Sequence, residues 1–174
     1  MAFKTLVTFV RDIVRDGDAL SAAAELAARE EAHLSVIVLG IDRLPPSAFY
    51  AGGNAIAMQE SLAQAQAEAD ETEKAVRKAL MGLTLSWDLA TFTVQVGAMG
   101  QVVAGRAQLA DLIVLPKPYG DTRGAEDVAV LEAALFGTRT PVMILPEGMS
   151  SAPTFSRAVL AWNESRESLA AIRA

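Results

Sequence analysis

Three aspartates that could hold a metal ion follow the first apolar run of the chain. Asp12, Asp16 and Asp18 are close together in the sequence, and carboxylates are the ligands that Mg²⁺ and Ca²⁺ prefer. The alternative is that Asp16 and Asp18 form a turn around Gly17 and cap the helix that follows, a common use of these residue types. We expect the capping role and no metal site.

The other reactive residue types form no recognisable catalytic constellation. His33 is the only histidine, and no partner lies at a spacing that would make it a general base or a zinc ligand. We predict a surface or structural role for it, on the amino-terminal side of the sheet. Lys117 could serve as the lysine of a phosphoacceptor receiver domain, but the third apolar run ends at Gly97 without the aspartate that such a domain needs. With no cysteine and no Gly-x-Ser-x-Gly motif either, we expect a protein that is not an enzyme.

Composition and charge exclude several classes of partner. The 174 residues carry 15 Lys plus Arg against 21 Asp plus Glu, a net charge of -6, so the field of the protein repels nucleic acid and anionic lipid. The apolar run at residues 6–10 is too short for a secretory signal, and no run approaches the ~20 residues that cross a bilayer. We therefore expect a cytoplasmic protein with no nucleic-acid or membrane partner.

Five short apolar runs predict β-strands, at residues 5–10, 34–39, 89–96, 111–115 and 141–145. Helical patterns lie between them: from the turn at residues 16–18 to about 31, at about 55–80, from 100 to about 109, and at about 126–136. Strands that alternate with helices pair in parallel through right-handed crossovers. The expected fold class is α/β, a flavodoxin-like or Rossmann-like three-layer sandwich with a five-stranded parallel sheet.

Ligands of such sheets bind at the carboxyl ends of the strands. The residues predicted at that edge are Arg11 and Asp12, Gly40 to Asp42, Gly97, and residues 116–124. Lys117 and Arg123, in the last of these segments, could meet an anion. This edge is therefore where a binding site is expected.

The residue pattern at the end of the chain resembles the beginning of a second domain. "FSRAVLAW" at 155–162 is similar to "FKTLVTFV" at 3–10, and each is followed by a polar turn and an alanine-containing helix. We predict an α/β domain at 1–146, a linker at 147–156, and the first strand and helix of a second, truncated domain at 157–174. Because an apolar strand needs a partner, the strand at 157–162 should be completed by further residues, or dock on an edge such as 141–145 or on another chain.

Four stretches carry a resemblance to a known family: "PPSAFYAGGN" at 45–54, "ADLIVL" at 110–115, "TPVMILP" at 140–146 and "VLAWNESRES" at 159–168. In this order they resemble the universal stress proteins, in particular the tandem, two-domain members. The resemblance implies a cytoplasmic stress-response protein that forms homodimers. In one branch it also implies ATP binding, through an Asp after the first strand and a loop of pattern Gly-two-Gly-nine-Gly-Ser/Thr after the fourth.

The chain departs from that ATP-binding pattern. Gly120 and Gly124 are separated by three residues instead of two, and the next Gly-Thr pair, at 137–138, lies at the end of a predicted helix, where carbonyls rather than N–H groups would meet a phosphate. Either Arg11 or Asp12 falls at the acidic position of the family. The residues that would form a degenerate nucleotide site are Arg11, Asp12, Gly40, Lys117, Gly120 and Gly124. We expect no cofactor in the first domain, and ATP or another adenine nucleotide is the ligand to test.

Three functions follow from these observations. The first is a non-enzymatic stress protein that acts through dimerisation and nucleotide sensing, with a first domain that does not bind ATP in the family manner. The second is an ATP-binding or ATP-hydrolysing enzyme of the same α/β superfamily, for which the ligand edge offers only Asp12 and Asp42 as general bases. The third is a small-ligand module with Phe49, Tyr50 and the Gly52-Gly53 pair as a lid.

Overall fold

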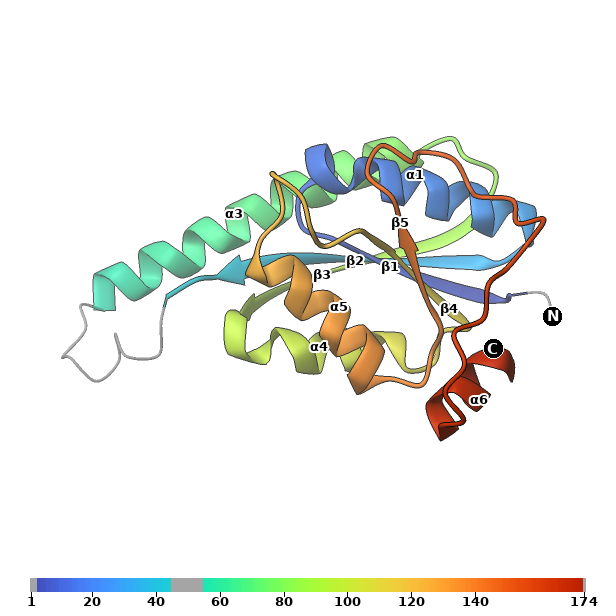
Figure 1. The fold of residues 1–174 in the computed structure, drawn as a ribbon. Helices are drawn as coiled ribbons and strands as arrows, with labels where there is room; N and C mark the ends of the chain where they lie inside the picture. The colour runs from blue at the N-terminus through green and yellow to red at the C-terminus, as the bar shows by residue number, and fades with distance from the viewer. Residues whose placement is uncertain (1–2, 45–54, 174) are drawn as a thin grey trace.

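A five-stranded parallel sheet forms the centre of the protein in a computed structural model, which describes residues 3–44 and 55–173 (Figure 1). The strands lie in the order β3-β2-β1-β4-β5 and all neighbours are parallel. This is the order of the first five strands of a doubly wound Rossmann sheet. The predicted fold class is therefore confirmed.

The strands are β1 (Thr5–Val10), β2 (His33–Asp42), β3 (Ser86–Gln95), β4 (Leu112–Pro116) and β5 (Val142–Leu145). The helices are α1 (Ile13–Arg29), α3 (Ala55–Leu80), α4 (Met99–Ala107), α5 (Ala125–Gly137) and α6 (Arg166–Arg173), with a 3-10 turn at Val96–Ala98. Each strand is close to its predicted position. Strand β2 is longer than predicted, because its carboxyl end continues through Gly40 to Asp42 in register with β3.

Helices cover both faces of the sheet. Figure 1 shows α1 and α3 over one face and α4 and α5 over the other. Leu34, Val36 and Val38 point to the first layer, whereas Ile37 and Leu39 point to the second. Alternate residues of one strand therefore pack into two separate cores, which is why β1 and β2 are mostly apolar in the sequence. No helix in the described part of the chain is long and apolar enough to cross a membrane.

The first helix begins earlier than predicted. Asp12, in an extended conformation, is its N-cap and accepts a hydrogen bond from the backbone N–H of Val14 at 2.8 Å. Asp16, Gly17 and Asp18 lie inside the helix, so the prediction that they form a turn and cap is wrong. The cost of a mid-helix glycine is small enough for the surrounding packing to override it.

The segment after β5 only partly matches the prediction. Its beginning packs on the sheet domain, since Ala152 is buried and donates its N–H to Glu25 on α1 at 2.9 Å. Residues 157–162 form no strand, and all their side chains are exposed, Val159 fully. The described residues do not show this segment docked on 141–145, and docking on another chain stays a prediction. The predicted helix is present as α6, and completion of a second domain by further residues stays a prediction.

Candidate functional site

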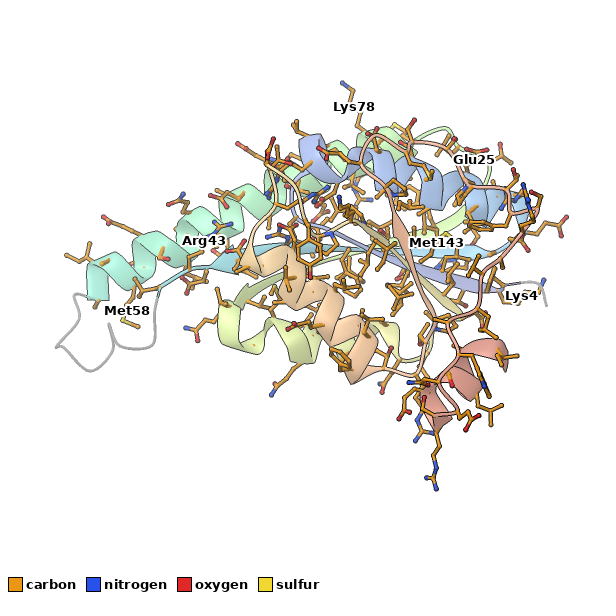
Figure 2. All side chains as sticks on the ribbon, in the orientation of Figure 1. Lys4, Glu25, Arg43, Met58, Lys78 and Met143 are labelled. Atoms are coloured by element: carbon orange, nitrogen blue, oxygen red, sulfur yellow. The ribbon has the colours of Figure 1, made fainter. Side chains whose placement is uncertain are left out.

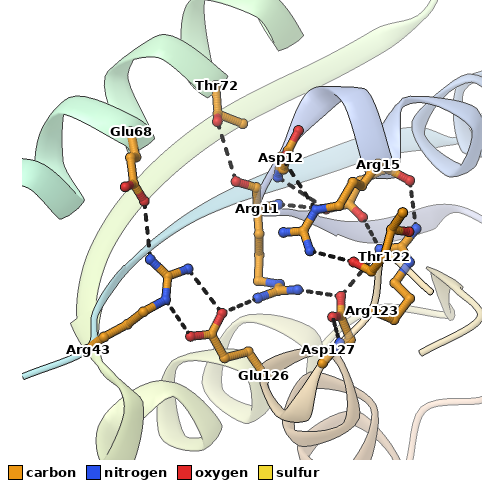
Figure 3. Close-up of polar contacts among 12 residues, drawn as sticks. Arg11, Asp12, Arg15, Arg43, Glu68, Thr72, Thr122, Arg123, Glu126 and Asp127 are labelled. Carbon is orange, nitrogen blue, oxygen red and sulfur yellow. Dashed lines mark hydrogen bonds and ion pairs between the residues drawn. The ribbon is translucent and has the colours of Figure 1, made fainter. Parts of the chain in front are cut away.

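Arg11, the first residue after β1, points into the carboxyl edge of the sheet (Figure 3). Its side chain is only 6% exposed. The guanidinium donates through Nη1 to Oε2 of Glu126 at 2.6 Å and through Nη2 to Asp127, both in the first turn of α5. The carboxyl end of β1 is thereby joined to the start of α5 by a buried guanidinium that bridges two carboxylates.

A second buried arginine, Arg123, joins the same helix start to α1. Its Nη1 pairs with Asp16 and lies 3.3 Å from Oδ1 of Asp127, and its Nη2 donates to the backbone carbonyl of Arg15 at 2.6 Å. The other oxygen of Asp16 accepts the backbone N–H of Arg11 at 2.8 Å. Asp16 is therefore bonded to protein groups through both oxygens, which opposes its use as a metal ligand.

Arg43, one residue beyond β2, completes the arrangement from the solvent side. Its Nε and Nη2 reach the two oxygens of Glu126 at 2.7 and 3.1 Å, and its Nη1 lies 3.4 Å from Glu68 on α3. Unlike Arg11, its side chain is 54% exposed. Three elements that are distant in the sequence thus meet at Glu126.

We call these six side chains the edge network: Arg11, Arg43, Arg123, Asp16, Glu126 and Asp127. Three guanidinium groups face three carboxylates, so the network is balanced in charge. This matters because a buried charge without a partner is costly, whereas a fully hydrogen-bonded pair is tolerated. Nothing in the network requires a bound ion to complete it.

Neighbouring charges shift the pKa values of Asp127, Glu126 and Arg123 in the direction that keeps these groups ionised. Burial alone would raise the pKa of Asp127, but the backbone N–H of Gly124 and the guanidinium of Arg11 hold it below its usual value. Burial would also raise the pKa of Glu126, and its contacts with Arg43 and Arg11 lower it instead. For Arg123, burial opposes the charged form, yet the contacts with Asp16 and Asp127 raise its pKa.

The amino-terminal end of α5 is filled by its own carboxylates. Gly124 is the N-cap, and its backbone N–H donates to Oδ2 of Asp127 at 2.7 Å. Glu126 and Asp127 therefore lie where a phosphate would have to approach the helix dipole. Gly120 has φ +149°, a conformation that favours glycine, and its carbonyl accepts the N–H of Arg123 at 3.1 Å.

The remaining predicted site residues have structural contacts or face solvent. Asp12 caps α1, and its Oδ2 accepts from Nε of Arg15 at 3.2 Å. Gly40 lies inside β2 against α3, where a Cβ would be 2.4 Å from the carbonyl oxygen of Ala65. Lys117 is exposed, and its backbone N–H bonds the carbonyl of Leu145 at 2.9 Å. In the structure Arg11 and Gly124 both lie beside Asp127, whereas Gly40 packs against α3.

Several cavities open at this edge of the sheet, and two of them border the charged residues at the start of α1. The larger, of about 460 Å³, lies between the start of α1, Arg43 and α3, and its lining includes Asp12, Glu68 and Glu71. The smaller, of about 210 Å³, lies between α1 and the segments after β4 and β5, beside Thr122 and Glu147. Carboxylates line both, and the cations beside them are largely paired. No group of three or more metal-binding side chains occurs in the parts of the chain that the structure describes.

The sequence did not identify Glu126, Asp127 or Arg43 as residues of this edge. Their partners are about a hundred positions away, since Arg11 and Asp127 are 116 positions apart and Arg43 and Glu126 are 83 apart. One signal was present: an arginine directly after a strand of apolar and β-branched residues, which implies a buried cation and hence a carboxylate partner. The proposed lid residues Phe49, Tyr50 and Gly52-Gly53 lie outside the described residues.

A separate cluster lies at the opposite, amino-terminal edge of the sheet. His33 begins β2, and its Nδ1 lies 2.8 Å from Oγ of Ser86 while its Nε2 lies 3.3 Å from Oδ1 of Asp88. These partners of His33 could not be recognised from the sequence, because they belong to β3. All three side chains are partly or largely exposed and no cavity with a described lining includes them. The position agrees with the predicted surface role of His33.

Comparison with known proteins supports the fold. The sequence matches no protein-family model and no curated protein. The hypothetical protein MJ0577 matches with a TM-score of 0.58 at 12% identity, over 84% of this chain and 98% of that one. A universal stress protein family member from Burkholderia pseudomallei matches with a TM-score of 0.55 at 18% identity, over 83% of this chain and 97% of that one. Universal stress proteins in complex with cAMP and with dAMP reach only 0.43 and 0.45, too low to carry an argument about ligands.

Proposed function

We propose that this chain is a non-enzymatic stress protein of the universal stress protein type, whose first domain serves as a scaffold and interface and does not hold ATP in the family manner. The observation that carries the proposal is the placement of Glu126 and Asp127. They occupy the helix start that would receive phosphate oxygens, and they already use the guanidinium groups of Arg11 and Arg123. Arg11 and Arg123 are therefore already paired with carboxylates.

Binding of ATP at α5 would replace the carboxylate partners of the buried arginines with phosphate oxygens. A triphosphate placed at α5 would have to take Arg11 or Arg123 away from a buried carboxylate, and breaking such a pair costs about 3–5 kcal/mol. Each 1.4 kcal/mol weakens binding about tenfold, so a site of about micromolar affinity would become about a hundred- to several-thousandfold weaker. Pro116 and Pro118, which lack backbone N–H groups, give no compensating donors. The expected dissociation constant for ATP is then about 0.1 mM to several mM.

The proposed mode of action is self-association and contact with other proteins in the cytoplasm. β3 and β5 are the two edges of the sheet, and edge strands offer unpaired backbone groups to a partner. Ile144 in β5 and Phe136 near the end of α5 are exposed apolar side chains. We propose a homodimer, which light scattering across a concentration series would detect as twice the monomer mass of 18.4 kDa.

Calorimetric titration with MgATP tests the nucleotide part of the proposal. We expect no saturable binding in the micromolar range, and a dissociation constant of about 0.1 mM or weaker. The variant Glu126→Gln frees Arg11 and Arg43 from one carboxylate, so it should bind MgATP more tightly than the wild type. Glu132→Gln, which removes the same charge from an exposed position on α5, is the matched control and should not. Micromolar binding by the wild type would contradict the proposal, and ATP turnover above background would favour the enzyme alternative.

A further inference from the structure

An apolar groove lies between α1 and the end of α3, on the first helical layer of the sheet. Its volume is about 370 Å³, at the small end of the range of about 300–1,000 Å³ for ligand pockets. The described lining consists of Leu20, Ser21, Ala24, Glu25, Ala28, Ala79, Leu80, Leu83, Thr84 and Leu85. It shares no residue with the edge network.

Small side chains on the facing helices leave this space open. Ala24 and Ala28 on α1 face Ala79 on α3, where longer side chains would fill the gap. Leu20 and Leu80 are almost fully buried and form the apolar floor, whereas Leu83 is about half exposed. A ligand in the groove would therefore remove apolar surface from water, which is the main favourable contribution to small-molecule binding.

One charged group is present in the lining, and it is held in a defined position. Oε2 of Glu25 accepts the backbone N–H of Ala152 at 2.9 Å, from the segment that follows β5. Figure 2 labels Glu25 on α1. Arg29, one helical turn further along, is turned to other partners: its Nη2 donates to the carbonyl of Pro153 at 3.2 Å and its Nε lies 3.7 Å from Glu30.

Ser21 in the lining also favours a ligand that donates hydrogen bonds. The hydroxyl of Ser21 donates to the carbonyl of Gly17 at 2.9 Å, so its oxygen is left as an acceptor. No lysine or arginine belongs to the described lining. An anion would meet Glu25 without a compensating charge, whereas a cation would be attracted by it and by the net charge of -6.

We propose that this groove binds small organic cations, with an apolar body against Leu20, Leu80 and Leu83 and a protonated amine beside the carboxylate of Glu25. The two requirements act together. The leucines favour an alkyl or aromatic body, and the carboxylate selects its charged end. Binding here is independent of the carboxyl edge and does not depend on whether the protein senses nucleotides.

Three probes of the same length separate the two requirements. Hexylammonium, 1-hexanol and hexanoate are titrated into the full chain and followed by chemical shifts of the protein amides. We expect saturable binding, with hexylammonium about three- to tenfold tighter than 1-hexanol, since a hydrogen bond to a charged group in a partly exposed site has that effect. Hexanoate should bind more weakly than 1-hexanol. Equal affinities for the three probes, or no saturable binding, would overturn the proposal.

Two variants locate the site. Glu25→Gln keeps an oxygen to accept the Ala152 N–H but removes the charge, so it should bind 1-hexanol unchanged and lose the preference for hexylammonium. Glu132→Gln, an equal change of charge on α5, should keep the preference. Ala28→Phe places a large side chain at an exposed rim position and should abolish binding of both probes without disturbing the core. A preference for hexylammonium that survives Glu25→Gln would refute the role of that carboxylate.

Discussion

Replacing Arg11 with methionine tests whether the edge network stabilises the fold. Methionine fills part of the volume of the arginine stem but carries no charge, so Asp127 and Glu126 lose a cation while staying where they are. Because the Arg11 side chain is only 6% exposed, its loss should reduce the free energy of unfolding by about 3–5 kcal/mol. In a domain of this size each kcal/mol lowers the Tm by about 2–4 °C, so we expect a decrease of about 6–20 °C.

Arg43→Met is the matched control, because Arg43 contacts the same Glu126 from a side chain that is 54% exposed. Exposed ion pairs contribute about 0–1 kcal/mol and are weakened by salt. Urea unfolding followed by circular dichroism, at low and high salt, would measure both variants. We expect a large, salt-insensitive loss for Arg11→Met and a small, salt-sensitive one for Arg43→Met. Equal losses below about 1 kcal/mol would refute the idea that burial gives the network its energetic importance.

Three further predictions concern single residues. The fold lowers the pKa of Asp127. The contribution of this carboxylate to stability should therefore be complete at pH values above the pKa in the unfolded state, about 3.9. It should be lost as the pH falls through the lower pKa of the folded state. The urea midpoint of Asp127→Asn should then fall less between about pH 5 and pH 2 than that of the wild type. Asp12→Ala should cost about 1 kcal/mol through loss of the α1 cap, and Asp12→Asn much less, in the same assay. Gly40→Ala places a Cβ 2.4 Å from the carbonyl oxygen of Ala65 and should cost at least about 1–3 kcal/mol; an unchanged midpoint would show that α3 moves freely.

The sheet could be predicted from the sequence because its strands are buried on both faces. β4 is an apolar run and β1 consists of apolar and β-branched residues, a pattern that depends only on neighbouring residues. The boundaries of the helices were harder to predict. The start of α1 was placed too late because aspartate and glycine at 16–18 are good turn formers, whereas the actual signal was a single cap at Asp12.

The edge network could not be predicted in the same way. Whether Arg11 meets Asp127 or Asp111 depends on which carboxylate the strand order brings to the carboxyl edge, and no local pattern contains that information. Asp111 in fact lies at the other end of the sheet, where its Oδ2 accepts the N–H groups of Lys4 and Thr5 at 2.8 and 2.9 Å. Gly40 illustrates the converse error, since a glycine at a strand end suggested a ligand contact and the structure shows a helix packed against it.

The strand order also has a consequence for how the protein is made. β1 lies between β2, which follows it closely in the chain, and β4, which does not: the hydroxyl of Thr8 donates to the carbonyl of Val114, 106 positions later. A ribosome adding about 5–20 residues per second needs roughly 5–20 s to synthesise that interval. Throughout that time the nascent chain carries an open apolar strand edge, the kind of surface that chaperones shield and that other unfinished chains can pair with. Successful biogenesis of this fold therefore depends on protecting β1 until β4 has left the exit tunnel.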